Sequence, residues 1–129
     1  MSFLAKFEID GDSHNVLKCS FRIIKPTDET GKVRSRPIGG EIKLVIESYE
    51  STNLFDWVIG VKELKDGSIT FYRRDSSSRF KTLEFSDGQC VDYEESYSHD
   101  GNVPMIIDLK LSCRVIKLND SEFQNDWPS

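Results

Sequence analysis

Cysteine is scarce in this chain, and the spacings that would give it a structural role are missing. The three cysteines, Cys19, Cys90 and Cys113, are an odd number and include no Cys-x-x-Cys pair. Zinc sites and disulfide frameworks depend on such paired spacings. Each cysteine falls inside a strand-like run, so we expect small buried thiols, no metal ligands and synthesis in a reducing compartment.

Histidine and the common catalytic motifs are also scarce. The chain has two histidines, His14 and His99, both beside predicted turns, and it lacks a G-x-S-x-G elbow, an HExxH motif and a P-loop. Asp92 and Glu94 share a strand face, but among 22 acidic residues such pairs arise by chance. We predict exposed histidines, no catalytic residue, no cofactor and no metal. An enzyme would need His14 or His99 as a general base.

A basic excess and long apolar runs are missing as well. The formal net charge of −5 argues against general nucleic-acid binding, which needs a basic surface. No apolar run approaches the length of a membrane span, and no secretory signal peptide is visible in residues 1–14. With 129 residues, 37% of them hydrophobic and 30% charged, we predict one domain, 1–129, with its own core.

Alternation of apolar and polar residues is the main pattern that is present. It predicts strands over residues 3–9, 16–24, 42–46, 68–73, 80–85, 90–97 and 105–117. Asp-Gly pairs at 10–11, 66–67, 87–88 and 100–101 are typical of the turns between such strands.

One helix is predicted, over LFDWVI at residues 54–59. Ser51, Thr52 and Asn53 offer capping side chains before it, and Gly60 is placed to end it. A single helix cannot supply the crossovers of a parallel sheet, so an antiparallel sandwich or small barrel is expected. Phe123 and Trp127 predict a C-terminal tail that docks on the domain.

The stretch PTDETGKVRSRPIGG, Pro26 to Gly40, is too long for a hairpin turn. We call it the arm. Val33 and Ile38 are its only large apolar residues, so it cannot anchor itself in the core of its own domain. Structureless connections of this length are uncommon unless they are functional or disordered. Composition leaves two interpretations open: a mobile surface loop, or an arm that orders against a partner.

Charge is unevenly distributed along the chain. Residues 84–100 contain acids and no Lys or Arg, whereas residues 22–36 are rich in Lys and Arg, as are residues 73–81. Ordinary solvated faces would account for this. The alternative is a head-to-tail contact between a basic surface of one copy and an acidic surface of the next, which generates rings or filaments.

Several motifs together resemble the Hcp (TssD) tube proteins of type VI secretion. They are VLKCSFRIIKPTDETGKVRSRPIGGEIKLVIES (16–48), LFDWV (54–58), DGSITFYRRD (66–75), DGQCV (87–91), NVPMIIDLKLS (102–112) and NDWP (125–128). The likeness is greatest to the divergent branch of the family that carries the PTDxTG…SRPxGG arm, and it covers almost the whole chain.

The resemblance implies a mainly β fold, an antiparallel two-sheet β-barrel with one short α-helix, as in phage tail tubes. It implies homohexameric rings that stack into a hollow tube and are expelled by sheath contraction. Sheath, spike and baseplate proteins would be partners, and secreted effectors would travel in the lumen. The protein would assemble in the cytoplasm and be exported to the extracellular space or a target cell without a signal peptide. A monomeric β-barrel that binds a ligand or acts as an adaptor is the alternative.

In this family the long loop reaches an adjacent subunit or ring, which corresponds to the arm. The predicted arm contacts are Pro26, Thr27, Asp28, Lys32, Arg34, Arg36, Pro37, Gly39 and Gly40. The predicted acidic partner surface is Asp87, Asp92, Glu94 and Glu95.

Overall fold

The computed structural model describes residues 3–127. Its elements in chain order are β1 (Phe3–Ile9), β2 (Asp12–Ile24), β3 (Ile38–Glu47), α1 (Asn53–Ile59), β4 (Lys65–Arg73), β5 (Arg79–Tyr97), β6 (Met105–Leu118) and β7 (Ser121–Gln124). The mainly β fold with one short helix is confirmed. β7 was not predicted, and Pro128, the last residue of the NDWP motif, lies outside the described residues.

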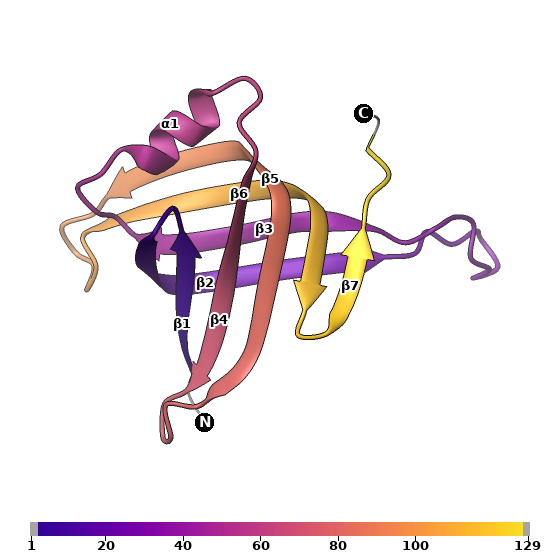
Figure 1. The fold of residues 1–129 in the computed structure, drawn as a ribbon, viewed down its shortest axis with the longest axis horizontal. Coiled ribbons are helices and arrows are strands. Elements are labelled where there is room, and N and C mark those ends of the chain that lie inside the picture. Colours follow the sequence, from indigo (N-terminus) through magenta and orange to yellow (C-terminus); the bar gives the residue numbers. More distant parts are fainter. Residues whose placement is uncertain (1–2, 128–129) are drawn as a thin grey trace.

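The strands form one antiparallel sheet in the order β3-β2-β1-β4-β5-β6-β7, which closes into a barrel because β3 also pairs with β6. The sheet has two halves that cross in Figure 1. β1 and β4 run steeply, whereas β2 and β3 run across behind them, and the long strands β5 and β6 bend to serve both halves. The predicted two-sheet barrel is therefore one continuous sheet bent upon itself.

The first hairpin is tighter than its sequence pattern suggested. Asp10 and Gly11 both have positive φ, 53° and 79°, as a two-residue type I′ turn requires. β2 therefore resumes at once, at Asp12, and His14 pairs with Phe7. The predicted exposure of His14 is wrong: its side chain is buried at 4% exposure between Phe7 and Tyr49.

Two Asp-Gly pairs lie inside strands: the pair at 66–67, predicted to open a strand, and the pair at 87–88, predicted as a turn. Residues 66–67 belong to β4, and residues 87–88 lie within β5, which joins the two strands predicted at 80–85 and 90–97. A Cβ atom on Gly67 would lie 2.7 Å from the Phe85 ring, and one on Gly88 would lie 2.8 Å from it. These glycines therefore make room for a buried aromatic ring at the bend of β5.

The helix α1 covers one opening of the barrel and ends at Gly60, as predicted. Leu54 and Trp57 are its buried residues, whereas Phe55 and Ile59 of the predicted apolar face are 46% and 63% exposed. Trp57 stacks on Phe85 in the core, and its indole nitrogen donates a hydrogen bond to the Glu63 carbonyl at 3.0 Å. No helix in residues 3–127 has the length and apolar character needed to cross a membrane.

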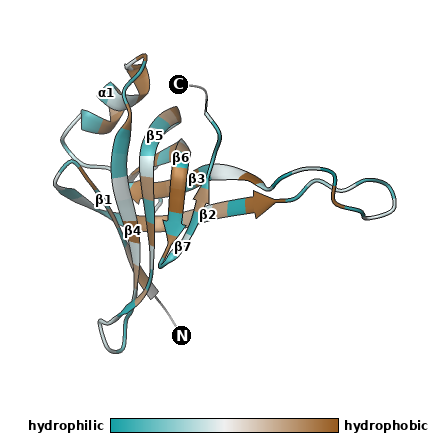
Figure 2. Ribbon diagram, turned by 45° about the vertical axis from the view of Figure 1, so that its right-hand side comes forward, coloured by the Kyte–Doolittle hydropathy of each residue, from teal (hydrophilic) through white to brown (hydrophobic). Residues whose placement is uncertain are grey.

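The arm projects from the barrel between β2 and β3. Figure 2 shows it extending well beyond the sheet, mostly hydrophilic along its length. Its two large apolar residues, Val33 and Ile38, are 54% and 53% exposed. The arm therefore makes no contribution to the core of its own subunit.

Candidate assembly surfaces

Four strand segments form a sheet with two unpaired edges. The order across it is β2 (residues 16–24), β3, β6 (105–112) and β5 (89–97). β2 pairs with β1 only over residues 12–15, and β5 pairs with β4 only up to Gly88. Within residues 3–127, the outer sides of residues 16–24 and 89–97 thus have no strand partner. Free edges of this length invite pairing with another chain.

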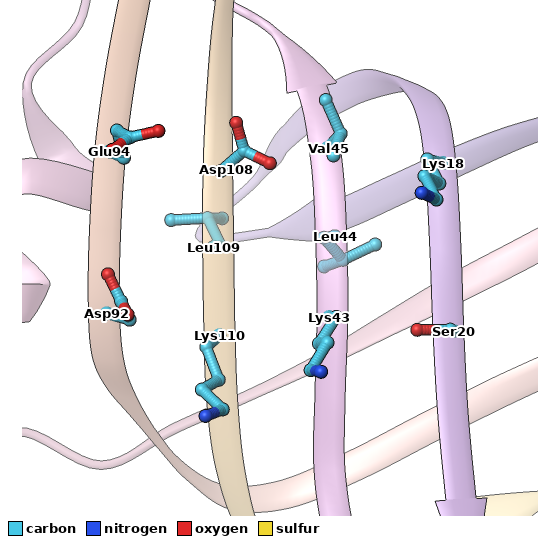
Figure 3. A pocket seen from close by; sticks show the side chains of 10 residues that line it. All are labelled: Lys18, Ser20, Lys43, Leu44, Val45, Asp92, Glu94, Asp108, Leu109 and Lys110. Atoms are coloured by element: carbon cyan, nitrogen blue, oxygen red, sulfur yellow. The ribbon is translucent and has the colours of Figure 1, made fainter.

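The outward face of this sheet carries charge in cross-strand rows, which Figure 3 shows around a shallow groove of about 560 Å³. One row runs Lys18, Val45, Asp108, Glu94, from the β2 edge to the β5 edge. The next row runs Ser20, Lys43, Lys110, Asp92. Arg22 lies further along β2, opposite Glu41. The β2 edge is therefore basic on this face, and the β5 edge is acidic.

The edge charges have no ion-pair partners within the described chain. Lys18, Arg22, Asp92 and Glu94 take part in none of the salt bridges formed among residues 3–127. Glu94 also lies directly opposite Asp108, a like charge. Like charges facing each other across strands are destabilising, so a cation supplied from outside the subunit would be favourable here.

The predicted acidic surface is divided in the structure. Asp92 and Glu94 share the outward face, whereas Glu95 lies on the other side of β5 and accepts hydrogen bonds from the Ser48 and Tyr93 hydroxyls. Asp87 is paired with Arg114 at 2.7 Å. The structure therefore brings two of the four residues together at the sheet edge.

An apolar groove of about 190 Å³ runs beside the free edge of β2. Its apolar lining consists of Phe21, Ile23, Leu83, Ile116, Leu118 and Phe123. On the other edge, a bulge in β5 leaves Val91 without a pairing partner and 52% exposed. Apolar surface thus accompanies both edges.

The tip of the arm is a small preformed hairpin. Thr27 bridges Val33, and the Arg34 amide donates to the Pro26 carbonyl at 2.8 Å. The Asp28 carboxylate accepts hydrogen bonds from the Thr30 hydroxyl and from the Thr30 and Lys32 amides. These bonds favour the charged form and hold the pKa of Asp28 below its usual value. The arm therefore has a defined local shape although it lies in solvent.

The base of the arm is held by the C-terminal segment. Gly39 and Gly40 are the second and third residues of β3, and Gly40 has φ 96°, a conformation that favours glycine. The Asn125 amide nitrogen donates to the carbonyls of Gly39 and Cys113, both at 3.0 Å. Arg36 pairs with Asp126 at 3.1 Å on the surface, next to Pro37. Phe123 packs against the core, so the C-terminal segment docks as predicted.

The groups capable of chemistry do not converge. Residues 3–127 contain no cluster of three or more His, Cys, Asp or Glu side chains suited to a metal ion. Burial raises the pKa values of Cys19 and Cys90 to about 11 and that of Cys113 to about 12. The predicted buried thiols are confirmed for Cys90 and Cys113, and Cys19 is half-buried. His99 is exposed, as predicted.

Two residues of these surfaces were not singled out from the sequence. Lys18 could have been found from its place on the polar side of the alternating run 16–24. Asn125 gave no signal beyond its place in the NDWP motif, because its bonding partners are backbone carbonyls distant in sequence.

A family model described as Hemolysin coregulated protein Hcp (TssD) matches residues 1–128. No curated protein matches this chain. Among solved structures, Hcp1 from Flavobacterium johnsoniae is similar with 34% sequence identity and a TM-score of 0.90, over 95% of this chain and 99% of that one.

More distant structures share the fold. Hcp1 from Salmonella typhimurium matches with 16% identity and a TM-score of 0.74, over 92% of this chain and 86% of that one. The secreted protein Hcp3 from Pseudomonas aeruginosa matches with 13% identity and a TM-score of 0.69, over 99% of this chain and 100% of that one.

Proposed function

Because this chain belongs to the Hcp (TssD) family of type VI secretion tube proteins, we propose that its free sheet edges close the ring and its arm joins neighbouring subunits. The ring consists of six copies, and stacked rings form the hollow tube that sheath contraction expels. The observation that carries the proposal is the pair of unpaired edges on one four-stranded sheet, with opposite charge on the same face.

Ring closure follows from strand direction. β2, β3, β6 and β5 are each antiparallel to the next, so β2 and β5 run in opposite directions. A rotated copy therefore offers its β5 edge to β2 in the antiparallel sense, and backbone groups on both edges gain partners. Lys18 and Arg22 of one subunit then face Asp92 and Glu94 of the next. Six copies supply roughly 24 strands, well above the 16–18 that already enclose an aqueous channel in porins.

Pairing at this edge also covers apolar surface. The groove lined by Phe21 and Ile23 lies beside β2, where the neighbour's β5 would run, and Val91 is the apolar residue at that neighbour's bulge. Burial of such groups contributes about 25 cal/mol for each Å² removed from water. The charges then select the register, and the apolar contact adds affinity.

The arm is proposed to contact an adjacent subunit or ring through its cations. Lys32, Arg34 and Arg36 are exposed on a hairpin that is already ordered, so little conformational entropy is lost on docking. Asp87, Asp92, Glu94 and Glu95 remain the predicted acidic partner surface. Asp87 and Glu95 have partners within their own subunit. Asp92 and Glu94 face the neighbour's β2 edge in the closed ring, so the arm would share these two acids with that contact.

Three further roles follow from the family as proposals. The outward polar face of the four-stranded sheet lines the lumen and contacts secreted effectors. Sheath, spike and baseplate proteins contact the outside and ends of the tube. The chain is assembled in the cytoplasm and leaves the cell with the tube, without a cleaved signal peptide.

Charge reversal of the arm tests its role. The variant Lys32→Glu, Arg34→Glu, Arg36→Glu is expected to form rings of normal mass but few tubes, scored by light scattering and negative-stain images. A matched control reverses three exposed cations off the arm, Lys62, Arg74 and Arg79. If the arm variant forms as many tubes as the wild type, the proposed role of the arm is contradicted.

A further inference from the structure

The base of the arm lies where two strands separate. β3 pairs with β6 from Glu41 onward, whereas β6 beyond Cys113 leaves β3 and pairs with β7 instead. The carbonyls of Gly39 and Cys113 lie at this fork, beyond the last β3–β6 pair. Without a donor from elsewhere, both carbonyl oxygens would lack the hydrogen bond that a continued β3–β6 ladder would supply.

One side chain bridges the fork. Asn125 follows β7, and its amide nitrogen, which carries two hydrogens, donates one bond to Gly39 and one to Cys113. The backbone amide of Asn125 donates to the Arg114 carbonyl at 2.7 Å, which fixes the residue to β6. β6, β7 and the first residues of β3 are thereby linked through a single half-buried side chain.

The glycines of the arm base fit this bridge. A Cβ atom on Gly40 would collide with the Asn125 amide nitrogen and would lie 2.5 Å from the Cys113 carbonyl oxygen. A Cβ atom on Gly39 would lie 2.8 Å from Ile23 and 3.3 Å from the Phe123 ring. The backbone can approach the C-terminal segment this closely only because neither residue has a side chain.

We propose that Asn125 is the positioning residue of the arm: its two hydrogen bonds fix the direction in which residues 26–40 leave the sheet, and ring stacking depends on that direction. The inference rests on the proposed role of the arm in assembly. The Arg36–Asp126 ion pair is 87% and 93% exposed, so it contributes little compared with the half-buried amide bridge.

The test combines a readout within the subunit with a readout of assembly. Asn125→Ala is compared with Gln124→Ala, which truncates an exposed side chain one residue earlier on the same segment. Hydrogen exchange followed by mass spectrometry is measured on peptides spanning 35–44, and tube yield is counted in negative-stain images. We expect exchange at least tenfold faster and tube yield at least fivefold lower for Asn125→Ala. Ring mass should be unchanged, and Gln124→Ala should match wild type.

Further variants separate the explanations. Asn125→Asp keeps the size of the side chain but places a carboxylate against two carbonyls, so it should behave like Asn125→Ala. It replaces Asn125→Ala as the test variant if the alanine variant does not fold. Asn125→Gln keeps the donors on a longer stem and should restore part of the tube yield.

Two outcomes overturn the proposal. The first is hydrogen exchange over residues 35–44 that is unchanged in both Asn125→Ala and Asn125→Asp. The second is faster exchange in these variants with full tube yield, while charge reversal of the arm abolishes tubes. The charge-reversed arm variant keeps Asn125, so it tests the proposed role of the arm separately. If that variant forms tubes normally, the proposed role of the arm in assembly is wrong.

Discussion

Exchange of one charge on each free edge gives the most informative perturbation of ring closure. Lys18→Glu makes the β2 edge less basic, and Glu94→Lys makes the β5 edge less acidic. Lys18 faces the neutral Val45, so its reversal changes no cross-strand charge pair within the subunit. Glu94 faces Asp108, so Glu94→Lys also turns a like-charge pair within the subunit into an opposite-charge pair. Either variant alone should weaken the ring, and the double variant should restore it.

The magnitude follows from cross-strand pairing. An opposite-charge pair across strands contributes about 0.2–1 kcal/mol, and a like-charge pair costs a similar amount. Reversal of one partner therefore weakens each interface by about 1 kcal/mol. A closed ring repeats the change at six interfaces, about 6 kcal/mol spread over five association steps, so the midpoint concentration of ring formation rises roughly eightfold.

A dilution series by sedimentation velocity measures that midpoint. High salt should reduce the difference between variants, since exposed charges are screened. Thermal unfolding of dilute monomer checks that each fold is intact. Edge-to-edge charge pairing is excluded if the single variants keep the wild-type midpoint, or if the double variant is as weak as the two changes added together.

Three further predictions concern the subunit itself. Trp57→Ala should lower the free energy of unfolding by about 3–5 kcal/mol in denaturant titrations, because the residue is 1% exposed and stacked on Phe85; a loss below about 1 kcal/mol would contradict this packing. Burial lowers the pKa of His14 although Asp12 opposes the shift, so its neutral form is favoured in the fold. The unfolded chain then binds the proton first, and stability should fall as pH drops below about 6.5; His14→Gln should flatten that dependence, and an identical pH profile would refute it. Cys113 should resist alkylation in the folded protein and react after denaturation, since it is fully buried with its pKa raised to about 12; rapid labelling of native protein would be the contrary result.

The strands could be predicted because alternation records which side of each strand meets the core. Ile107, Leu109 and Leu111 form one apolar row in the sequence, and all three are buried in the structure. His14 was misplaced because its neighbours are polar. The type I′ turn at Asp10-Gly11 would have placed His14 opposite Phe7, had the strand been continued directly from the turn.

Asp-Gly pairs were ambiguous for a physical reason. At residues 10–11 the pair forms a turn, whereas Gly67 and Gly88 lie in strands because the Phe85 ring occupies the space of a side chain. Local sequence carries the same two letters in both cases, and only tertiary packing distinguishes them.

Only part of the candidate assembly surfaces could be predicted from the sequence. The arm could be recognised from its length and its lack of apolar residues. Alternation placed Asp92 and Glu94 on one strand face, but the partners that Asp87 and Glu95 find within the subunit depend on strand pairing, which the sequence does not show. The Asn125 bridge depends on where β6 leaves β3, which no local pattern records.

Ring closure through the two free edges is tested most directly by a cryo-electron microscopy map of the assembled ring or tube at a resolution that separates strands. Residues 16–24 of each subunit should pair antiparallel with residues 89–97 of the next, with Lys18 and Arg22 beside Asp92 and Glu94. A ring in which either edge faces solvent, or pairs with any other segment, would contradict it.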